Sequence, residues 1–406
     1  MQKEGISLSH LMSKQKKIAL MVARRAPLLA MLLLLCSVVA RGEVFVTSIP
    51  DGGLQPRLVT AADGGVHLLY FKKRLSAPSA REGNLYYREY LREERRFGLP
   101  IKVSSTAFNL QTFAIARASM AIDGEGRAHV IWYLPRENRY LYARSDVQRL
   151  QFEEQRSLVS AYIEGVDAAA DVAAEGNQVA IVWGAGALSA EQERTVYARF
   201  SDDGGESFGA EQRVGNKDLG ACACCSLAAE FDPQGRLSIA YRSAIDGVGR
   251  HMQWLTLHAE TSSLATANEA LRGDYSPLQP LQEWEMSSCP LSTNDFALDT
   301  NGEPWVAFET AARIIRLKAN GTAAAVQEPA TQTRQKNPSI AVAANGDVLT
   351  AWGEAISHSK GGALRAQLED ANGVIIEWEL GTEITLPNFS FPAAAAIGGN
   401  DFLLLW

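Results

Sequence analysis

The chain has little cysteine and little histidine, and it has no charged low-complexity tract. Only five of its 406 residues are cysteines and six are histidines, and the paired C-x₂-C segments of structural zinc sites are absent. Stretches with the apolar period of an amphipathic helix are also missing between the strand-like segments. These absences argue against a zinc domain and against a helical fold, and they leave short strands and turns as the organising pattern.

The apolar run over residues 26–40 is shorter than the ~20 residues that a membrane-spanning helix needs. It follows a basic segment and precedes small residues, which is the layout of a secretory signal peptide. We expect cleavage after Ala40 or Gly42, so that residues 1–42 are a signal peptide and residues 43–406 are exported from a bacterial cell. The sequence therefore predicts a periplasmic or secreted protein without stable membrane insertion after cleavage.

Loss of this leader makes the protein strongly acidic. It removes seven of the 39 basic residues and one of the 46 acidic residues, which leaves a net charge of −13. An acidic body repels phosphate backbones and anionic lipid surfaces. We therefore expect neither nucleic acid nor an anionic membrane as a partner.

One short pattern recurs through residues 43–406. It consists of an apolar strand, a tight turn containing glycine, and a second strand that ends on a large aromatic residue, as in residues 121–132. The closing aromatics of the seven copies are Tyr70, Trp132, Trp183, Tyr241, Phe308, Trp352 and Trp406. Repetition of small four-stranded units at this spacing predicts an all-β fold, a β-propeller with seven blades, or with six as the runner-up.

Both ends of the mature chain lack partners in the sequence. Residues 43–48 form a strand with no neighbouring hairpin, and the last copy supplies only two strands before Trp406. Pairing of the first strand with the last blade would close the ring and cover the exposed edges. We expect this closure, and we expect the four repeated tryptophans to lie in the core between blades.

The motif Ser201-x-Asp203-x-Gly205-x-x-Phe208 is an Asp-box, a turn in which the aspartate accepts backbone hydrogen bonds. At these residues the chain resembles the sialidase-like propeller superfamily with bacterial neuraminidase (BNR) repeats. The resemblance covers residues 43–406. In that family the box is a folding device away from the active face, so it implies no catalytic role for these four residues.

A second motif combines Cys222-x-Cys224-Cys225 with Arg242 and Cys289. Here the chain resembles secreted bacterial BNR-type proteins without an established activity. Since the first strand of every blade starts on the same face near the channel, the cysteines before blades four and five should meet at the channel mouth. We expect Arg242, at the end of a second strand, to bind a ligand on that face.

Two interpretations of the cysteines remain open. In an exported protein, four cysteines favour two disulfides, with Cys224–Cys289 or Cys225–Cys289 joining two blades and the other pair lying in a local loop. The rival is a soft-metal site of Cys222, Cys224, Cys225 and Cys289, with copper(I) as the occupant that clustered thiolates select.

A sialidase needs an arginine triad, a tyrosine nucleophile with a glutamate partner, and an aspartic acid. The resemblance offers Arg57, Arg242 and Tyr275 as candidates, although the family's Arg-Ile-Pro order is absent at Arg57 and Tyr275 comes early in the chain. Tyr275 falls in a long irregular segment, residues 259–280, of blade four. A strand-capping arginine and a loop tyrosine are the favoured interpretation of these residues.

We therefore expect an exported sialidase-like β-propeller that acts as a binding or assembly module through its channel mouth, where a glycan, a small molecule or a protein would bind. The alternative function is an exo-sialidase or related glycoside hydrolase acting on sialylated or similar acidic glycans. The two hypotheses differ in what surrounds the channel, because an enzyme should gather three arginines and an acid–tyrosine pair there.

Overall fold

The computed structural model describes residues 42–406 apart from residues 75–80, 111–115, 135–136, 169, 258–273, 276–283, 319–320, 328–332 and 357–360. The expected signal peptide therefore lies outside the described residues except for Gly42. Most of the irregular segment 259–280 lies outside them as well. Across the described ranges, no helix is long and apolar enough to cross a membrane.

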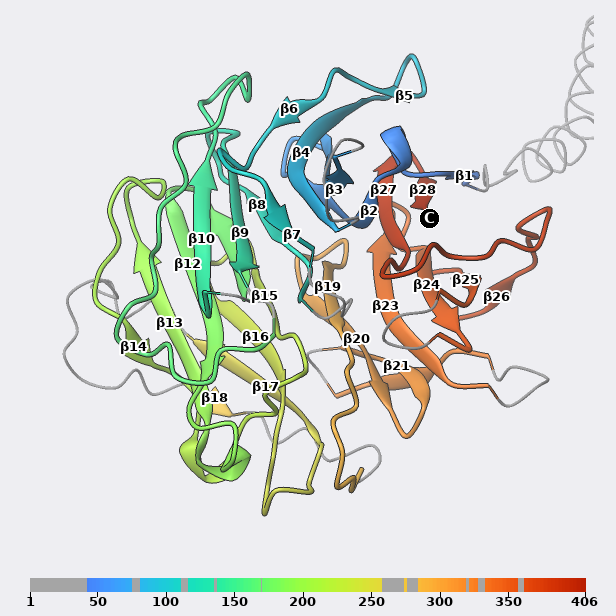
Figure 1. The fold of residues 1–406 in the computed structure, drawn as a ribbon. Coiled ribbons are helices and arrows are strands. Elements are labelled where there is room, and N and C mark those ends of the chain that lie inside the picture. Colours follow the sequence, from blue (N-terminus) through green and yellow to red (C-terminus); the bar gives the residue numbers. More distant parts are fainter. Residues whose placement is uncertain are drawn as a thin grey trace, which may run out of the picture. The chain divides into compact units, whose positions relative to one another are not determined.

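The described chain is an all-β, seven-bladed propeller, as the repeat predicts (Figure 1). Each blade is a small sheet, and the inner strands of successive blades contact one another in a closed ring. The inner strands of blades one to seven are β2 (Leu54–Thr60), β8 (Ser119–Ile122), β11 (Asp171–Glu175), β15 (Ala228–Phe231), β19 (Asn294–Leu298), β23 (Gln335–Val342) and β27 (Ala393–Gly398).

The second strand of every blade pairs antiparallel with the inner one, and the closing aromatic lies among its last four residues or, in the last blade, just after its end. These second strands are β3 (Val66–Lys73), β9 (Ala128–Leu134), β12 (Gln178–Ala185), β16 (Leu237–Arg242), β20 (Pro304–Thr310), β24 (Val348–Glu354) and β28 (Asp401–Leu405). The third strands are β4 (Glu82–Leu91), β10 (Arg139–Arg144), β13 (Thr195–Ser201), β17 (Met252–Leu257), β21 (Arg313–Lys318) and β25 (Ala363–Glu369).

The outer strands are short, as edge strands in soluble sheets commonly are. They are β5 (Arg96–Phe97), β14 (Gln212–Arg213), β18 (Asp274–Tyr275), β22 (Ala323–Ala325) and β26 (Ile375–Ile376), with β6 (Ile101–Lys102) and β7 (Phe108–Asn109) also pairing with β4. Blade two continues outward through isolated bridges, Tyr142 to Arg156 and Ser145 to Phe152.

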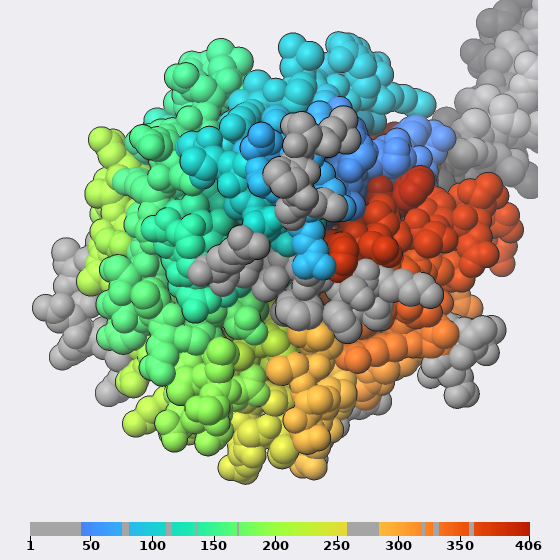
Figure 2. All heavy atoms as spheres, viewed as in Figure 1, coloured from blue at the N-terminus to red at the C-terminus, as the bar shows by residue number. Residues whose placement is uncertain are grey.

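The two ends of the described chain close the ring. Strand β1 (Val44–Thr47) pairs with β28, so the expected closure is confirmed, and the pairing is parallel. Figures 1 and 2 show the blue start of the propeller against its red end. The joint extends beyond the strands, because the Ile49 N–H donates to the carbonyl oxygen of Trp406 at 3.0 Å.

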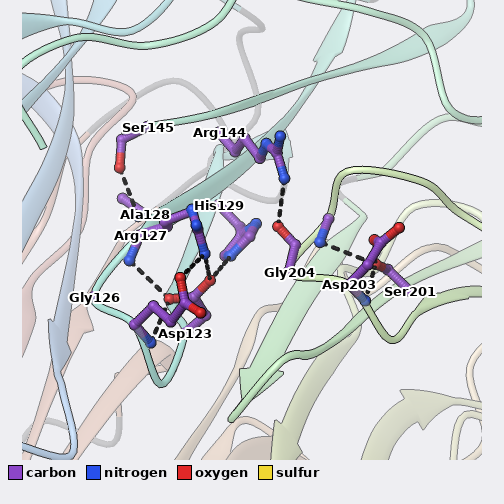
Figure 3. A network of polar contacts seen from close by, with 12 residues as sticks. Asp123, Gly126, Arg127, Ala128, His129, Arg144, Ser145, Ser201, Asp203 and Gly204 are labelled. Carbon is purple, nitrogen blue, oxygen red and sulfur yellow. Dashed lines mark hydrogen bonds and ion pairs between the residues drawn. The ribbon is translucent and has the colours of Figure 1, made fainter. Parts of the chain in front are cut away.

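The repeated hairpin turn has a simple local cause. In blade two, Asp123 Oδ1 accepts hydrogen bonds from the N–H groups of Glu125 and Arg127 at 2.9 and 2.8 Å, and Gly126 takes a φ of 88° that disfavours a side chain. His129 follows the turn, and its Nε2 is hydrogen-bonded to Asp123 Oδ2 at 3.1 Å (Figure 3). The aspartate and the glycine together set the chain reversal.

The closing aromatics lie between neighbouring blades. Each gap between two blades holds a hydrophobic cluster, and each cluster contains one of the seven closing aromatics. Trp132 lies between blades one and two, Trp183 between two and three, and Trp352 between five and six. Trp406 is partly buried and packs against the cluster between blades six and seven, so all four repeated tryptophans lie between blades as expected.

The Asp-box forms the turn between β13 and β14. Asp203 Oδ1 accepts from the Ser207 N–H and Ser201 Oγ accepts from the Gly205 N–H, both at 2.9 Å. Phe208 packs edge-on against Tyr142 of blade two, and Arg144 donates to the Gly204 carbonyl at 2.9 Å (Figure 3). The box thus joins blades two and three at the hairpin end of the sheets.

A buried leucine in the closing blade tests how much the closure contributes. Leu404 is 0% exposed, pairs with Val46 of β1, and packs between blades six and seven. We expect Leu404→Ala to lower the free energy of unfolding by about 2–5 kcal/mol, since it leaves a cavity in the joint. Chemical denaturation measures this change.

The matched control is Leu99→Ala, because Leu99 is 82% exposed. It should change the free energy of unfolding by no more than about 0.5 kcal/mol. Equal effects of the two substitutions would contradict the assigned role of the β1–β28 joint.

Candidate functional site

One face of the propeller collects the segments that precede inner strands and the ends of second strands. In blade four, Ala228 at the start of β15 pairs with Ala240 near the end of β16, so Cys225 and Arg242 lie at this end. The Cys222 N–H donates to the Arg242 carbonyl at 2.9 Å and fixes the cysteine segment there. We call this face, around the inner strands, the mouth.

The four cysteines of the described chain meet at the mouth. A disulfide joins Cys224, before blade four, to Cys289, before blade five, which is one of the two expected inter-blade pairings. Cys222 and Cys225 are buried free thiols, with their Sγ atoms 3.4 Å apart, so the expected local disulfide is not formed. The Sγ atom of Cys222 also lies 3.6 Å from that of Cys224.

Cations and one aromatic ring border the cysteines. Arg242 is fully buried and donates to the carbonyl oxygens of Arg250 and Glu309. Its guanidinium lies over the ring of Trp284 at 4.8 Å, and that of Arg334 lies over the same ring at 5.7 Å. Arg242 is therefore at the mouth as expected, but both of its terminal nitrogens donate hydrogen bonds to backbone carbonyls of the fold.

The two free thiols differ in their pKa. Although burial favours the neutral thiol, a hydrogen bond from Cys222 and the charge of Arg242 lower the pKa of Cys225. The same hydrogen bond, followed by burial, raises the pKa of Cys222. An electropositive setting of this kind stabilises a thiolate, which is the form that binds metals and attacks disulfides.

Blade three adds a carboxylate to the cluster. Glu191 begins the short 3-10 turn η3 (Glu191–Glu193); it accepts from the Ala223 N–H at 2.8 Å and pairs with Arg250 at 2.6 Å. One carboxylate oxygen of Glu191 and the sulfur atoms of Cys222, Cys224 and Cys289 all lie within 4.8 Å of one another. With the disulfide reduced, these atoms could hold one metal ion.

A second polar cluster lies deeper in the channel. Arg57 of β2 forms an ion pair with Asp295 of β19, and Arg117 lies 3.8 Å from the same carboxylate. Asp295 Oδ2 also accepts from Ser339 Oγ at 2.8 Å. On the other side of the channel, Asp171 accepts from Ser119. The cluster therefore connects inner strands of blades one, two, three, five and six.

These residues occupy equivalent places in the repeat. In every blade, one inner-strand residue pairs with the residue just before the closing aromatic. Around the ring this layer is Arg57, Ser119, Asp171, Ala228, Asp295, Ser339 and Ala393. The equivalence supplies a signal that sequence reasoning missed, because the position lies 12 or 13 residues before each closing aromatic.

The charges of the channel influence one another. Burial raises the pKa of Asp171, and burial followed by the charge of Arg57 lowers the pKa of Arg117 to about 10. The pKa of Arg57 is raised despite burial, because Asp295 and Asp171 are close. Glu230, two residues beyond Ala228 in β15, has its pKa raised to about 8 by burial, against the charge of Arg57.

The three residues proposed for a sialidase-like site are not brought together. Arg57 lies in the channel against Asp295, and Arg242 lies at the mouth beside Trp284. Tyr275 lies on β18, the outermost strand of blade four, paired with Leu255. Among the described residues, the partners of Arg57 are carboxylates from other blades.

Comparison with known proteins finds only distant structural similarity. No protein-family model matches the chain, and no curated protein matches it. Similar solved structures include a protein of unknown function from Dyadobacter fermentans (TM-score 0.49, 11% identity, covering 80% of this chain and 95% of that one). The resemblance to BNR-type proteins with the cysteine motif stays a prediction.

Two enzymes are similar at the same level. An α-L-arabinofuranosidase from Fusarium graminearum has a TM-score of 0.48 and 10% identity, over 80% of this chain and 94% of that one. A Trypanosoma rangeli sialidase has a TM-score of 0.47 and 11% identity, over 78% of this chain and 57% of that one. At such identities no functional residue is transferable.

The raised pKa of Glu230 predicts a pH-dependent stability. Between its ordinary value of 4.5 and about 8, the native state holds a proton that the unfolded state has released. The contribution of this group is therefore full below about pH 4.5 and is lost as pH rises through about 8. We expect the melting temperature of Glu230→Gln, relative to that of the wild type, to increase from about pH 5 to about pH 9.

Thermal melts across this range measure the effect, with Glu379→Gln on the exposed part of blade six as the control. The control should follow the wild type at every pH. Parallel curves for wild type and Glu230→Gln would show that the proton is not retained on this carboxyl.

Proposed function

We propose that the propeller acts, after export, as a ligand-binding module whose site is the cysteine cluster at the mouth, and that its ligand is copper(I). The observation that carries the proposal is the convergence of three segments from blades three, four and five. Their Glu191 oxygen and the sulfur atoms of Cys222, Cys224 and Cys289 lie within 4.8 Å of one another, and Cys225 Sγ lies 3.4 Å from Cys222 Sγ.

The donor set favours a soft ion. Thiolates select copper(I) over the harder ions that prefer carboxylate and water ligands. Cys222, Cys224 and Cys225 are buried and pack with Ala168, while Cys289 is exposed and gives access from outside. The full set requires reduced Cys224 and Cys289, and the dithiol of Cys222 and Cys225 is present without reduction.

Export is supported by two features of the chain. The leader has the organisation of a signal peptide, and a disulfide joins blades four and five. Disulfides persist mainly in the periplasm and outside the cell. A periplasmic or secreted location also suits a site that captures a metal ion arriving from the surroundings.

The alternative, an exo-sialidase or related glycosidase, has less support. Binding of a substrate carboxylate needs arginines that are free to pair with it. Arg57 and Arg117 both face Asp295, and Arg242 donates to two backbone carbonyls. The candidate nucleophile Tyr275 belongs to an outer strand. We therefore favour the binding module.

A copper competition tests the proposal. Fully reduced protein of residues 43–406 is titrated anaerobically with copper(I) held by a chromophoric chelator, and loss of the chelator's colour reports transfer. We expect the wild type to take one equivalent from the chelator. Cys222→Ser should weaken binding by more than about tenfold, since Cys222 contacts both Cys224 and Cys225.

Ser226→Ala is the matched control, because Ser226 is buried next to the cluster and has no sulfur. It should bind copper(I) like the wild type. Equal competition by wild type and Cys222→Ser, or no transfer to the wild type, would refute the cysteine site.

A further inference from the structure

Cys222 lies between a thiol and a disulfide. With Cys225 it forms a C-x-x-C pair whose sulfur atoms are 3.4 Å apart, and its Sγ lies 3.6 Å from Sγ of Cys224, which is bonded to Cys289. Thiol–disulfide exchange begins when a thiolate reaches a disulfide sulfur. The structure therefore places a nucleophile, Cys222, 3.6 Å from the electrophilic sulfur of Cys224.

We propose that the mouth carries out internal thiol–disulfide exchange that frees Cys289 as a reactive surface thiol. Cys222 attacks Sγ of Cys224, 3.6 Å away, as a thiolate, and the proton that it loses is returned to Sγ of Cys289 when that sulfur leaves. A Cys222–Cys224 bond forms, the Cys224–Cys289 bond breaks, and its electron pair leaves on Sγ of Cys289. One disulfide and two thiols are present before and after, so no oxidant or reductant is consumed.

The backbone around Cys289 does not depend on the disulfide for its position. On one side, the Arg250 N–H donates to the Trp284 carbonyl at 2.7 Å and the Met286 N–H donates to the Val248 carbonyl at 2.9 Å. On the other side, Lys336 Nζ donates to the Pro290 carbonyl at 2.8 Å. Cleavage of the sulfur–sulfur bond therefore leaves the segment in place.

Further contacts hold the same region. Arg334 donates to the Pro290 carbonyl at 3.0 Å, and the Ser226 N–H donates to the Ser292 carbonyl at 3.3 Å. The Cys222 N–H and the Ala223 N–H are bonded to Arg242 and to Glu191. The sulfur atoms are thus the part of the mouth that can change partners while the main chain stays fixed.

The exchange changes which sulfur is exposed as a thiol. Cys222, Cys224 and Cys225 are buried, whereas Cys289 is exposed. Exchange moves the disulfide inward and brings a thiol to the surface. The substrate class that this thiol suits is a small disulfide: Cys289 attacks one of its sulfurs, a mixed disulfide forms on Cys289, and the other half leaves as a thiol. The exchange needs no metal, and it uses the same four cysteines as the proposed copper site in their partly oxidised state.

The test uses metal-free protein of residues 43–406, purified without reductant, with glutathione disulfide as the probe. A thiol count on the denatured protein first establishes two free thiols. After incubation, acid quenching and alkylation, tryptic peptides are mapped by mass spectrometry. We expect glutathione on Cys289, together with an internal Cys222–Cys224 disulfide and one alkylated cysteine, Cys225, in the peptide of residues 218–236.

Cys222→Ser should lower glutathione incorporation at Cys289 by at least about tenfold, since the internal nucleophile is gone. Ser226→Ala, with every thiol intact, should react like the wild type. Melting temperatures establish that both variants are folded. Should Cys222→Ser fail to fold, the disulfide map of the wild type decides by itself.

Three results would overturn the proposal. They are an unmodified Cys289, equal modification in wild type and Cys222→Ser, or oxidation to a Cys222–Cys225 disulfide with Cys224–Cys289 intact. None of these affects copper(I) binding by the fully reduced protein, so failure of the exchange and failure of the copper site are separate outcomes.

Discussion

The whole structure depends on the need of every blade to cover both faces of its sheet. A sheet with two apolar faces is stable only when a neighbour packs on each, and seven blades satisfy this only if the ring closes. The parallel pairing of β1 with β28 makes the closing blade, and its leucines fill the gaps to blades six and one. Without that pairing, two of the inter-blade clusters would face water.

Closure creates a second problem at the centre of the ring. The inner strands present an unpaired edge to the channel, and their N–H groups need acceptors. Side chains of the preceding blade supply several of them: Asp171 accepts from the Ala229 N–H at 2.7 Å, and Asp295 accepts from the Ile340 N–H at 3.1 Å. Ser339 accepts likewise from the Ala394 N–H at 3.0 Å.

This arrangement explains why the channel is charged. Carboxylates that satisfy strand edges are themselves buried, and a buried charge is tolerated only when it is paired. Arg57 provides the pairing across the channel. Arg57, which resembles a substrate-binding arginine in the sequence, is therefore the ion-pair partner of a buried carboxylate in the fold. Glu230 has no ion-pair partner among the described residues, and burial raises its pKa to about 8.

The repeat made the fold predictable, because an apolar strand, a glycine turn and an aromatic recur with the same local physics in every blade. The closing aromatics, the joint of the two ends and the meeting of Cys224 with Cys289 follow from that repeat. The polar layer was not foreseen, because its members differ chemically (Arg57, Ser119 and Asp171 are equivalent) and their partners come from other blades. The choice between Cys224 and Cys225 as the partner of Cys289 is likewise set by three-dimensional placement.

At the mouth, one set of groups holds the main chain in place and another set, the sulfur atoms, is available for chemistry. The main chain of the mouth is held by contacts of Glu191, Arg250, Arg334 and Lys336 with backbone groups and by the ion pair of Glu191 with Arg250. The sulfur atoms therefore carry little of the positioning, and a change of their partners leaves those contacts intact. Arg242 links the two, because its carbonyl holds the Cys222 N–H and its charge, after the hydrogen bond from Cys222, lowers the pKa of Cys225.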